Sequence, residues 1–144
     1  MTQVDFYILD DPAADARQRF ACRLAEKAWQ QGHQVYIHTG DPVLSARLDD
    51  LLWTFRQGSF VPHGLDDDPA SDEVAIHIGH GEEPRHHDEV LINLGQDLPL
   101  FFSRFRRVAE VVDNNEENRR AGRERFRFYR DRGYALQSHS IKHG

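Results

Sequence analysis

The chain has 144 residues and a mass of 16.7 kDa, which suits one domain, residues 1–144, and leaves little room for two. Charged residues make up 29%, but 9 Phe, 2 Trp and 4 Tyr supply enough apolar area to exclude a wholly disordered chain. The single Cys22 excludes an intrachain disulfide and a multi-cysteine zinc site. No apolar run is long enough to span a membrane and Met1–Asp10 lacks a signal-peptide pattern, so we expect a cytoplasmic protein with no membrane partner.

The charge is unevenly distributed along the chain. Residues 1–103 hold 7 basic and 18 acidic residues, whereas residues 104–132 hold 10 Arg and 6 acidic residues, within a net charge of -6. An acidic body is poorly suited to coating duplex DNA, because that task needs many cations against the phosphates. The compact Arg-rich segment instead favours a short acidic ligand, since a planar guanidinium can donate two parallel hydrogen bonds to one carboxylate.

Strands and helices are predicted to alternate from the N-terminus. The apolar stretch Val4–Leu9 predicts a buried strand, and apolar residues at three- and four-residue spacing predict a helix that Gly32 ends. A second strand is expected at Val35–Thr39. Asp41 then caps a second helix over Pro42–Phe55.

The remaining chain predicts further strands between polar connections. We expect an aromatic loop at Gly58–Leu65 and an acidic connector at Asp66–Glu73. The last long helix is expected over Glu116–Arg132, stopped by Gly133. The other expected elements are strands at Val74–Ile78, Val90–Leu94 and Arg107–Val112 and a brief helix at Pro99–Phe105. This order predicts an α/β fold, a three-layer sandwich around a mostly parallel five-stranded sheet.

An acidic pair follows the first predicted strand. Asp10 and Asp11, with Asp41, could bind a divalent ion, as in a receiver-like or nucleotide-handling α/β domain, because ligands of such sheets lie at the strand C-termini. That chemistry also needs a suitably placed lysine, and the chain offers only Lys27 and Lys142. A solvated turn and helix cap explains the pair equally well.

The histidines and glycines give no stronger catalytic signal. His77, His80, His86 and His87 gather near one polar stretch and could suggest a metal site, but a surface loop is favoured. Gly79 and Gly81 form a lone GxG, and neither a phosphate-binding motif nor a nucleophile motif occurs elsewhere. We therefore expect no catalytic residue and no cofactor.

The predicted last helix carries a basic face beside aromatic residues. Arg119, Arg123, Arg127 and Arg130 share one face at spacings of four, four and three. A solvated face balanced by neighbouring Glu is one interpretation, and direct binding of single-stranded nucleic acid is another. A peptide with acidic side chains, an apolar anchor and a terminal carboxylate would also use this surface.

A second candidate surface is apolar. Leu52, Trp53 and Phe55 precede a loop that contains Phe60, Val61 and Pro62. Part of this cluster can be ordinary core. Exposed Trp and Phe are also typical anchors for a partner protein.

Several motifs resemble one family along nearly the full chain. They are FYILD at Phe6–Asp10, LLWTF and SFVPH between Leu51 and His63, VLINL at Val90–Leu94, EVVD at Glu110–Asp113 and RERFRFYRDRGY at Arg123–Tyr134. In this order they resemble the chi subunit of the bacterial DNA polymerase III holoenzyme. The resemblance implies a non-catalytic accessory subunit of the clamp-loader assembly that reaches DNA only indirectly.

The resemblance also implies two partners and their sites. One partner is the acidic, Phe-terminated C-terminal tail of single-stranded DNA-binding protein (SSB), and the other is the psi subunit. Carried onto this sequence, the SSB-tail site comprises Arg119, Arg123, Phe126 and Arg127, and the psi site comprises Trp53 and Phe60.

Overall fold

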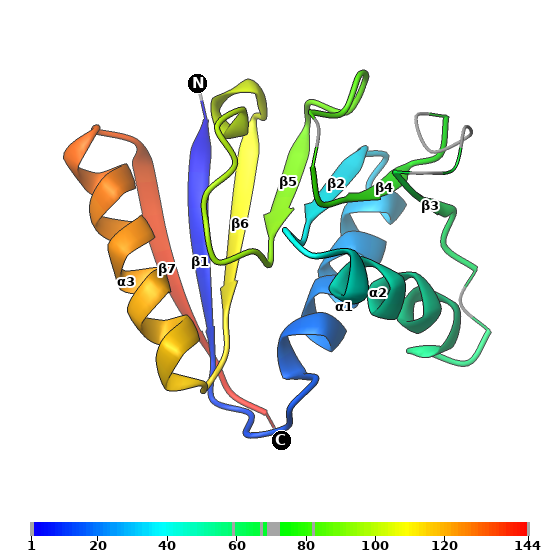
Figure 1. The fold of residues 1–144 in the computed structure, drawn as a ribbon, viewed down its shortest axis with the longest axis horizontal. Helices are drawn as coiled ribbons and strands as arrows, with labels where there is room; N and C mark the ends of the chain where they lie inside the picture. The colour runs from blue at the N-terminus through cyan, green and yellow to red at the C-terminus, as the bar shows by residue number, and fades with distance from the viewer. Residues whose placement is uncertain (1, 59, 67, 69–72, 82, 144) are drawn as a thin grey trace.

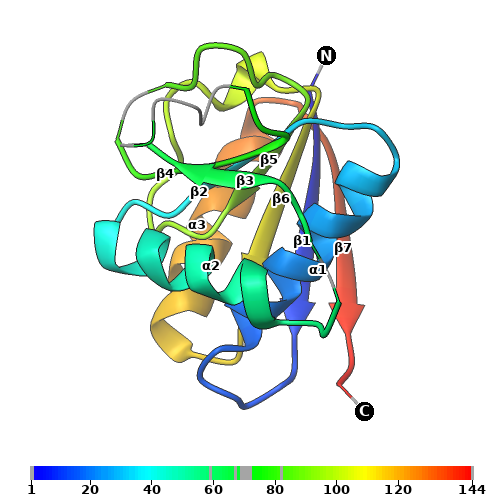
Figure 2. The same cartoon turned by 90° about the vertical axis from the view of Figure 1, so that its right-hand side faces the viewer.

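A computed structural model describes residues 2–58, 60–66, 68, 73–81 and 83–143 (Figures 1 and 2). Alternating strands and helices make up most of the described chain. In order they are β1 (Gln3–Leu9), α1 (Ala16–Gln30), β2 (Val35–His38), α2 (Pro42–Thr54), β3 (His63–Leu65), β4 (Ile76–Gly79), β5 (Val90–Asn93), a 3-10 turn (Phe102–Arg104), β6 (Arg107–Val112), α3 (Glu116–Asp131) and β7 (Ala135–Ile141). Among the described residues, no helix is both long and apolar enough to cross a membrane.

The strands form one sheet in the order β3-β4-β2-β5-β6-β1-β7, and every neighbouring pair is parallel. Helices α1 and α2 cover one face and α3 covers the other (Figures 1 and 2). Leu48 of α2 belongs to the core on the first face, whereas Phe6 and Tyr129 belong to the core on the α3 face. The predicted three-layer α/β sandwich is confirmed.

The prediction of five strands is corrected to seven. The two additional strands, β3 and β7, form the two edges of the sheet. β3 is only 3 residues long, at the end of the segment predicted as an aromatic loop. The residues of β7 are exposed or only partly buried, so its side chains carry a weak apolar pattern and its backbone pairing with β1 defines it.

The local signals for helix ends are confirmed. The Asp41 side chain accepts a hydrogen bond of 3.0 Å from the Val43 amide at the start of α2. Gly133, just after α3, has a φ of 77°, a left-handed conformation that favours glycine. Within the predicted acidic connector, residues 67 and 69–72 lie outside the described residues.

Candidate functional site

A hollow of about 220 Å³ lies between α3 and the sheet. Its walls combine apolar side chains of the strands with basic and aromatic side chains of the helix. The lining residues are Phe6 and Ile8 of β1, Val112 of β6, Ser138 of β7, and Arg119, Gly122, Arg123 and Phe126 of α3. Such a site can hold one apolar group and place an anionic group against the two guanidinium groups.

Helical periodicity and strand register bring these residues together. Arg119, Arg123 and Phe126 follow one another at spacings of four and three, so they share one face of α3. Phe6 and Ile8 are two apart on β1, so both face α3. The parallel register then pairs Ile8 with Val112 and Phe6 with Ser138. The hollow therefore depends on three adjacent strands and one helix.

Gly122 allows α3 to lie close to the sheet at this point. A Cβ at this position would lie 2.9 Å from Cγ2 of Val112, closer than real side chains approach. The absence of a side chain therefore lets the helix pack closely against Val112 and leaves space in the hollow beside Gly122.

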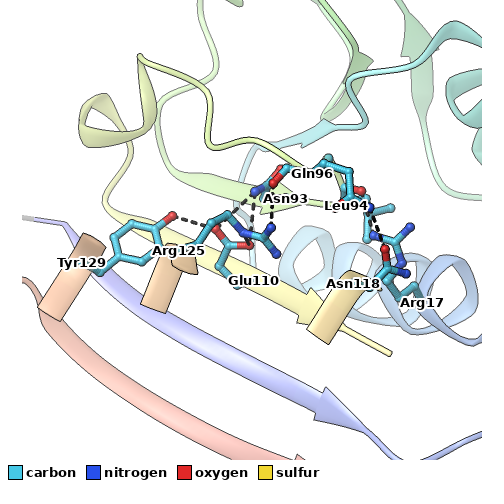
Figure 3. Close-up of polar contacts among 9 residues, drawn as sticks. Arg17, Asn93, Leu94, Gln96, Glu110, Asn118, Arg125 and Tyr129 are labelled. Carbon is cyan, nitrogen blue, oxygen red and sulfur yellow. Dashed lines mark hydrogen bonds and ion pairs between the residues drawn. The ribbon is translucent and has the colours of Figure 1, made fainter. Parts of the chain in front are cut away.

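A buried polar cluster fixes α3 against the sheet (Figure 3). The fully buried Glu110 of β6 accepts hydrogen bonds from Arg125 Nε at 2.8 Å and from the Tyr129 hydroxyl at 2.8 Å. Asn93 Nδ2 donates to the same carboxylate at 3.1 Å, and Arg125 Nη1 donates to the Gln96 carbonyl at 2.8 Å. Burial and the adjacent Glu110 charge raise the pKa of Tyr129, so its hydroxyl stays a donor.

Arg125 is buried and is not part of the basic surface that the sequence predicted for this helix. Its side chain is only 9% exposed and its charge is paired with Glu110. Arg120 also has acidic partners, since its guanidinium contacts Glu117 at 2.6 Å and Glu124 at 4.0 Å. Arg125 therefore fixes α3 in place, whereas Arg120 forms exposed pairs within the helix that contribute little to stability.

The arginines of the hollow are much less neutralised. Arg119 Nε donates to the Asp113 carbonyl at 3.1 Å, a neutral acceptor that leaves its charge in place. Arg123 forms an ion pair of 3.7 Å with Glu116, but the Glu116 side chain is 88% exposed, so solvent weakens the pair. Arg127, which lies outside the hollow on the same side of α3, makes no ion pair among the described residues. Positive potential therefore persists on this face of α3.

The structure brings together three of the four residues predicted for this site. Arg119, Arg123 and Phe126 line the hollow, whereas the exposed Arg127 lies one turn beyond Arg123 and does not line it. Sequence reasoning missed the apolar wall formed by the strands. Phe6 and Ile8 stand two residues apart in the predicted strand, which places them on one face, but only the tertiary structure shows that this face adjoins the Arg helix.

The second predicted surface splits into exposed and buried parts. Trp53 at the end of α2 is 56% exposed and Phe60 is 77% exposed, whereas Leu52 and Val61 are buried. The Trp53 ring lies 4.7 Å from the ring of His63, which supports its orientation. Ser59, in the SFVPH segment, lies outside the described residues.

The acidic residues considered for a metal have other partners. Asp10 accepts hydrogen bonds from the His143 amide and ring, which lower the pKa of that carboxyl. Asp11 accepts from the Ala13 amide, and Asp41 caps α2. In the described part of the chain, no group of three or more His, Cys, Asp and Glu is arranged to hold a metal ion.

The prediction of a histidine surface loop is wrong for two of its four members. His77 lies buried on β4, 2.6 Å from Asp66, and His87 is fully buried with its Nε2 2.8 Å from the Val74 carbonyl. His86, which precedes His87 in the loop between β4 and β5, is exposed. Two of the four histidines are therefore buried with backbone or carboxylate partners.

Known proteins resemble this chain over nearly its whole length. Residues 1–137 match the family described as DNA polymerase III chi subunit, HolC. The chain belongs to the DNA polymerase III chi subunit family. The DNA polymerase III subunit chi of Pseudomonas aeruginosa is 48% identical over 141 residues, 98% of each chain.

Two further relatives in the chi family are more distant. The subunit chi of Haemophilus influenzae is 28% identical over 94% of this chain and 95% of its own, and that of Escherichia coli is 29% identical over 99% and 100%. The crystal structure of T4 UvsW shares the fold with a TM-score of 0.68 at 9% identity. That match covers 98% of this chain and 42% of the UvsW chain.

Proposed function

We propose that this chi-family chain is a binding subunit of the DNA polymerase III clamp-loader assembly that joins the psi subunit to the C-terminal tail of SSB. The hollow beside α3 carries the proposal, because it combines an apolar chamber with Arg119 and Arg123 at its wall. An acidic peptide that ends in Phe offers a benzyl group and a terminal carboxylate to these two features. No reaction is needed for this role, and DNA is reached only through SSB.

The energetics favour a modest, salt-sensitive contact. A hydrogen bond to a charged group contributes about 1.5 to 3 kcal/mol, and less where both groups are exposed. Burying a Phe side chain adds about 1.5 to 3 kcal/mol. Several tails on one SSB assembly would strengthen the attachment by avidity.

The Trp53–Phe60 surface is proposed as the psi contact. Both side chains are exposed and large, and aromatic residues of this kind carry much of the energy of protein interfaces. α2 and β3 lie at the end of the sheet away from α3 and β7 (Figure 1). This separation allows both partners to bind at once.

The tail site is tested by calorimetry with a synthetic peptide rich in Asp and ending in Phe. We expect Arg123→Ala to weaken binding by roughly tenfold or more, because it removes a cation from the hollow. Arg120→Ala is the matched control, since Arg120 is 60% exposed on the same helix and does not line the hollow. Equal affinities of the wild type and the Arg123 variant would refute the tail site.

The psi site is tested by co-purification of the two subunits. We expect Trp53→Ala and Phe60→Ala each to reduce psi retention, because each removes an exposed apolar anchor. Both variants should keep the wild-type affinity for the acidic peptide. Undiminished psi retention in both variants would refute the assignment, and parallel loss of peptide binding would indicate misfolding.

A further inference from the structure

β7 presents an open edge of the sheet. It is the last strand in the sheet order, and no strand of the described residues lies beyond it (Figure 1). Exposed edges are usually protected by proline, charged side chains or bulges. The segment ALQSHSI contains no proline, lysine, arginine or acidic residue, and its seven residues pair with β1 without interruption.

The register identifies which backbone groups face outward. The Asp10 amide donates to the Ile141 carbonyl at 3.2 Å, so Ile141 directs its backbone toward β1. Alternate residues of a parallel strand direct both backbone groups to the same side. The outward amides and carbonyls therefore belong to Leu136, Ser138 and Ser140.

This edge is continuous with the hollow. Ser138 lines the hollow and also directs its backbone outward at the open edge. A peptide whose last residue occupies the hollow would therefore leave it beside β7. Main-chain hydrogen bonding to an exposed edge is a common way of binding an extended peptide.

The positive charge of α3 beside this edge favours an acidic peptide over a second copy of the chain. α3 runs back along β7, because the two elements are joined by a tight turn at Gly133. Arg119, Arg123 and Arg127 recur every fourth residue along this helix, so they form a basic row parallel to the edge strand. Two copies paired through β7 would bring two such rows together, which like charges disfavour.

We propose that the open edge of β7 binds the acidic segment preceding the anchoring residue as an eighth strand. This inference rests on the proposed function, since the anchor in the hollow delivers the segment to the edge. The backbone of β7 supplies hydrogen bonds that are independent of peptide sequence. The basic row on α3 supplies the preference for acidic side chains.

The first test compares peptides by calorimetry on the full chain. A peptide containing only the Phe-ended anchor is compared with a longer acidic peptide and with versions of it that carry one N-methyl group on successive upstream amides. We expect the longer peptide to bind more tightly and N-methylation at every second position to reduce affinity by roughly threefold to tenfold. The intervening positions should tolerate the change. Equal effects at all upstream positions would overturn the proposal.

The second test follows amide hydrogen exchange by NMR. The amides of Leu136, Ser138 and Ser140 should exchange rapidly in the free protein and slow by roughly tenfold or more with the longer peptide, but not with the anchor-only peptide. Gln137 and His139, which direct their amides to β1, serve as internal controls that are protected in both states. Unchanged exchange of the outward amides in a saturated complex would overturn the eighth strand.

The two proposals fail in different ways. If only the eighth-strand proposal is wrong, the anchor peptide still binds and Arg123→Ala still weakens its binding. Anchor binding that ignores Arg123→Ala refutes the tail site itself and the strand proposal with it. If amide exchange at β7 slows with protein concentration in the absence of peptide, the edge serves self-association and the proposal is overturned.

Discussion

Two arginines only two residues apart on α3 have different proposed roles because their burial differs. Arg125 faces the sheet and is paired with the fully buried Glu110. Arg123 faces the hollow with its side chain 57% exposed, and its one acidic neighbour, Glu116, is 88% exposed at 3.7 Å. The chemistry of the side chain is the same, so its surroundings decide whether it stabilises the fold or is available to a ligand.

Arg125→Ala should therefore be a stability variant. Removing one partner leaves the Glu110 charge buried without compensation, so we expect the free energy of unfolding to fall by about 3 to 5 kcal/mol. Urea denaturation followed by circular dichroism measures this change. Arg120→Ala should differ from the wild type by no more than about 0.5 kcal/mol. Similar losses in both variants would contradict the assigned role of the buried pair.

At the scale of elements, the position of α3 against the sheet sets the size of the hollow. The buried polar cluster fixes the helix through Glu110, and Gly122 permits its close approach to Val112. α3 and the three strands β6, β1 and β7 therefore act as one unit. A change at their contact should alter both stability and binding.

Gly122→Ala tests this contact. Greater helix propensity should add about 1 kcal/mol of stability, but overpacking against Val112 should cost about 1 to 3 kcal/mol. We expect net destabilisation in urea and weaker binding of the acidic peptide, because Gly122 also lines the hollow. Gly81→Ala is the control, since a Cβ there meets nothing within 4 Å. A more stable Gly122 variant with unchanged binding would show that α3 is not tightly seated.

At the scale of the whole molecule, the two proposed faces differ in chemistry as well as in place. The net charge is -6, yet the α3 face is basic, and the Trp53–Phe60 surface is apolar. Salt screens exposed charges strongly and apolar contacts little. The two partners should therefore respond differently to ionic strength.

Raising the salt concentration from about 0.1 M to about 1 M shortens the screening length from about 10 Å to about 3 Å. We expect this change to weaken peptide binding by roughly tenfold while psi association remains within about twofold. Calorimetry of both partners across a salt series checks the contrast. A peptide affinity that is independent of salt would argue against ion pairing by Arg119 and Arg123.

The sequence alone determined the features that depend on near neighbours along the chain. Apolar spacing predicted α1 and α2, apolar stretches predicted the interior strands, and the signals at Asp41 and Gly133 located helix ends. The common face of Arg119, Arg123 and Phe126 also followed from helical periodicity. These features could be predicted because each is set within a few residues.

Only the tertiary structure decided what lies opposite each face. It separated the paired Arg125 from the exposed Arg123 and brought Phe6 and Val112 to the wall of the hollow. It also added β7, whose side chains carry little apolar pattern because pairing with β1 holds it through the backbone. Contacts between distant residues depend on strand order and register, and these are set by the packing of the whole chain rather than by any local pattern.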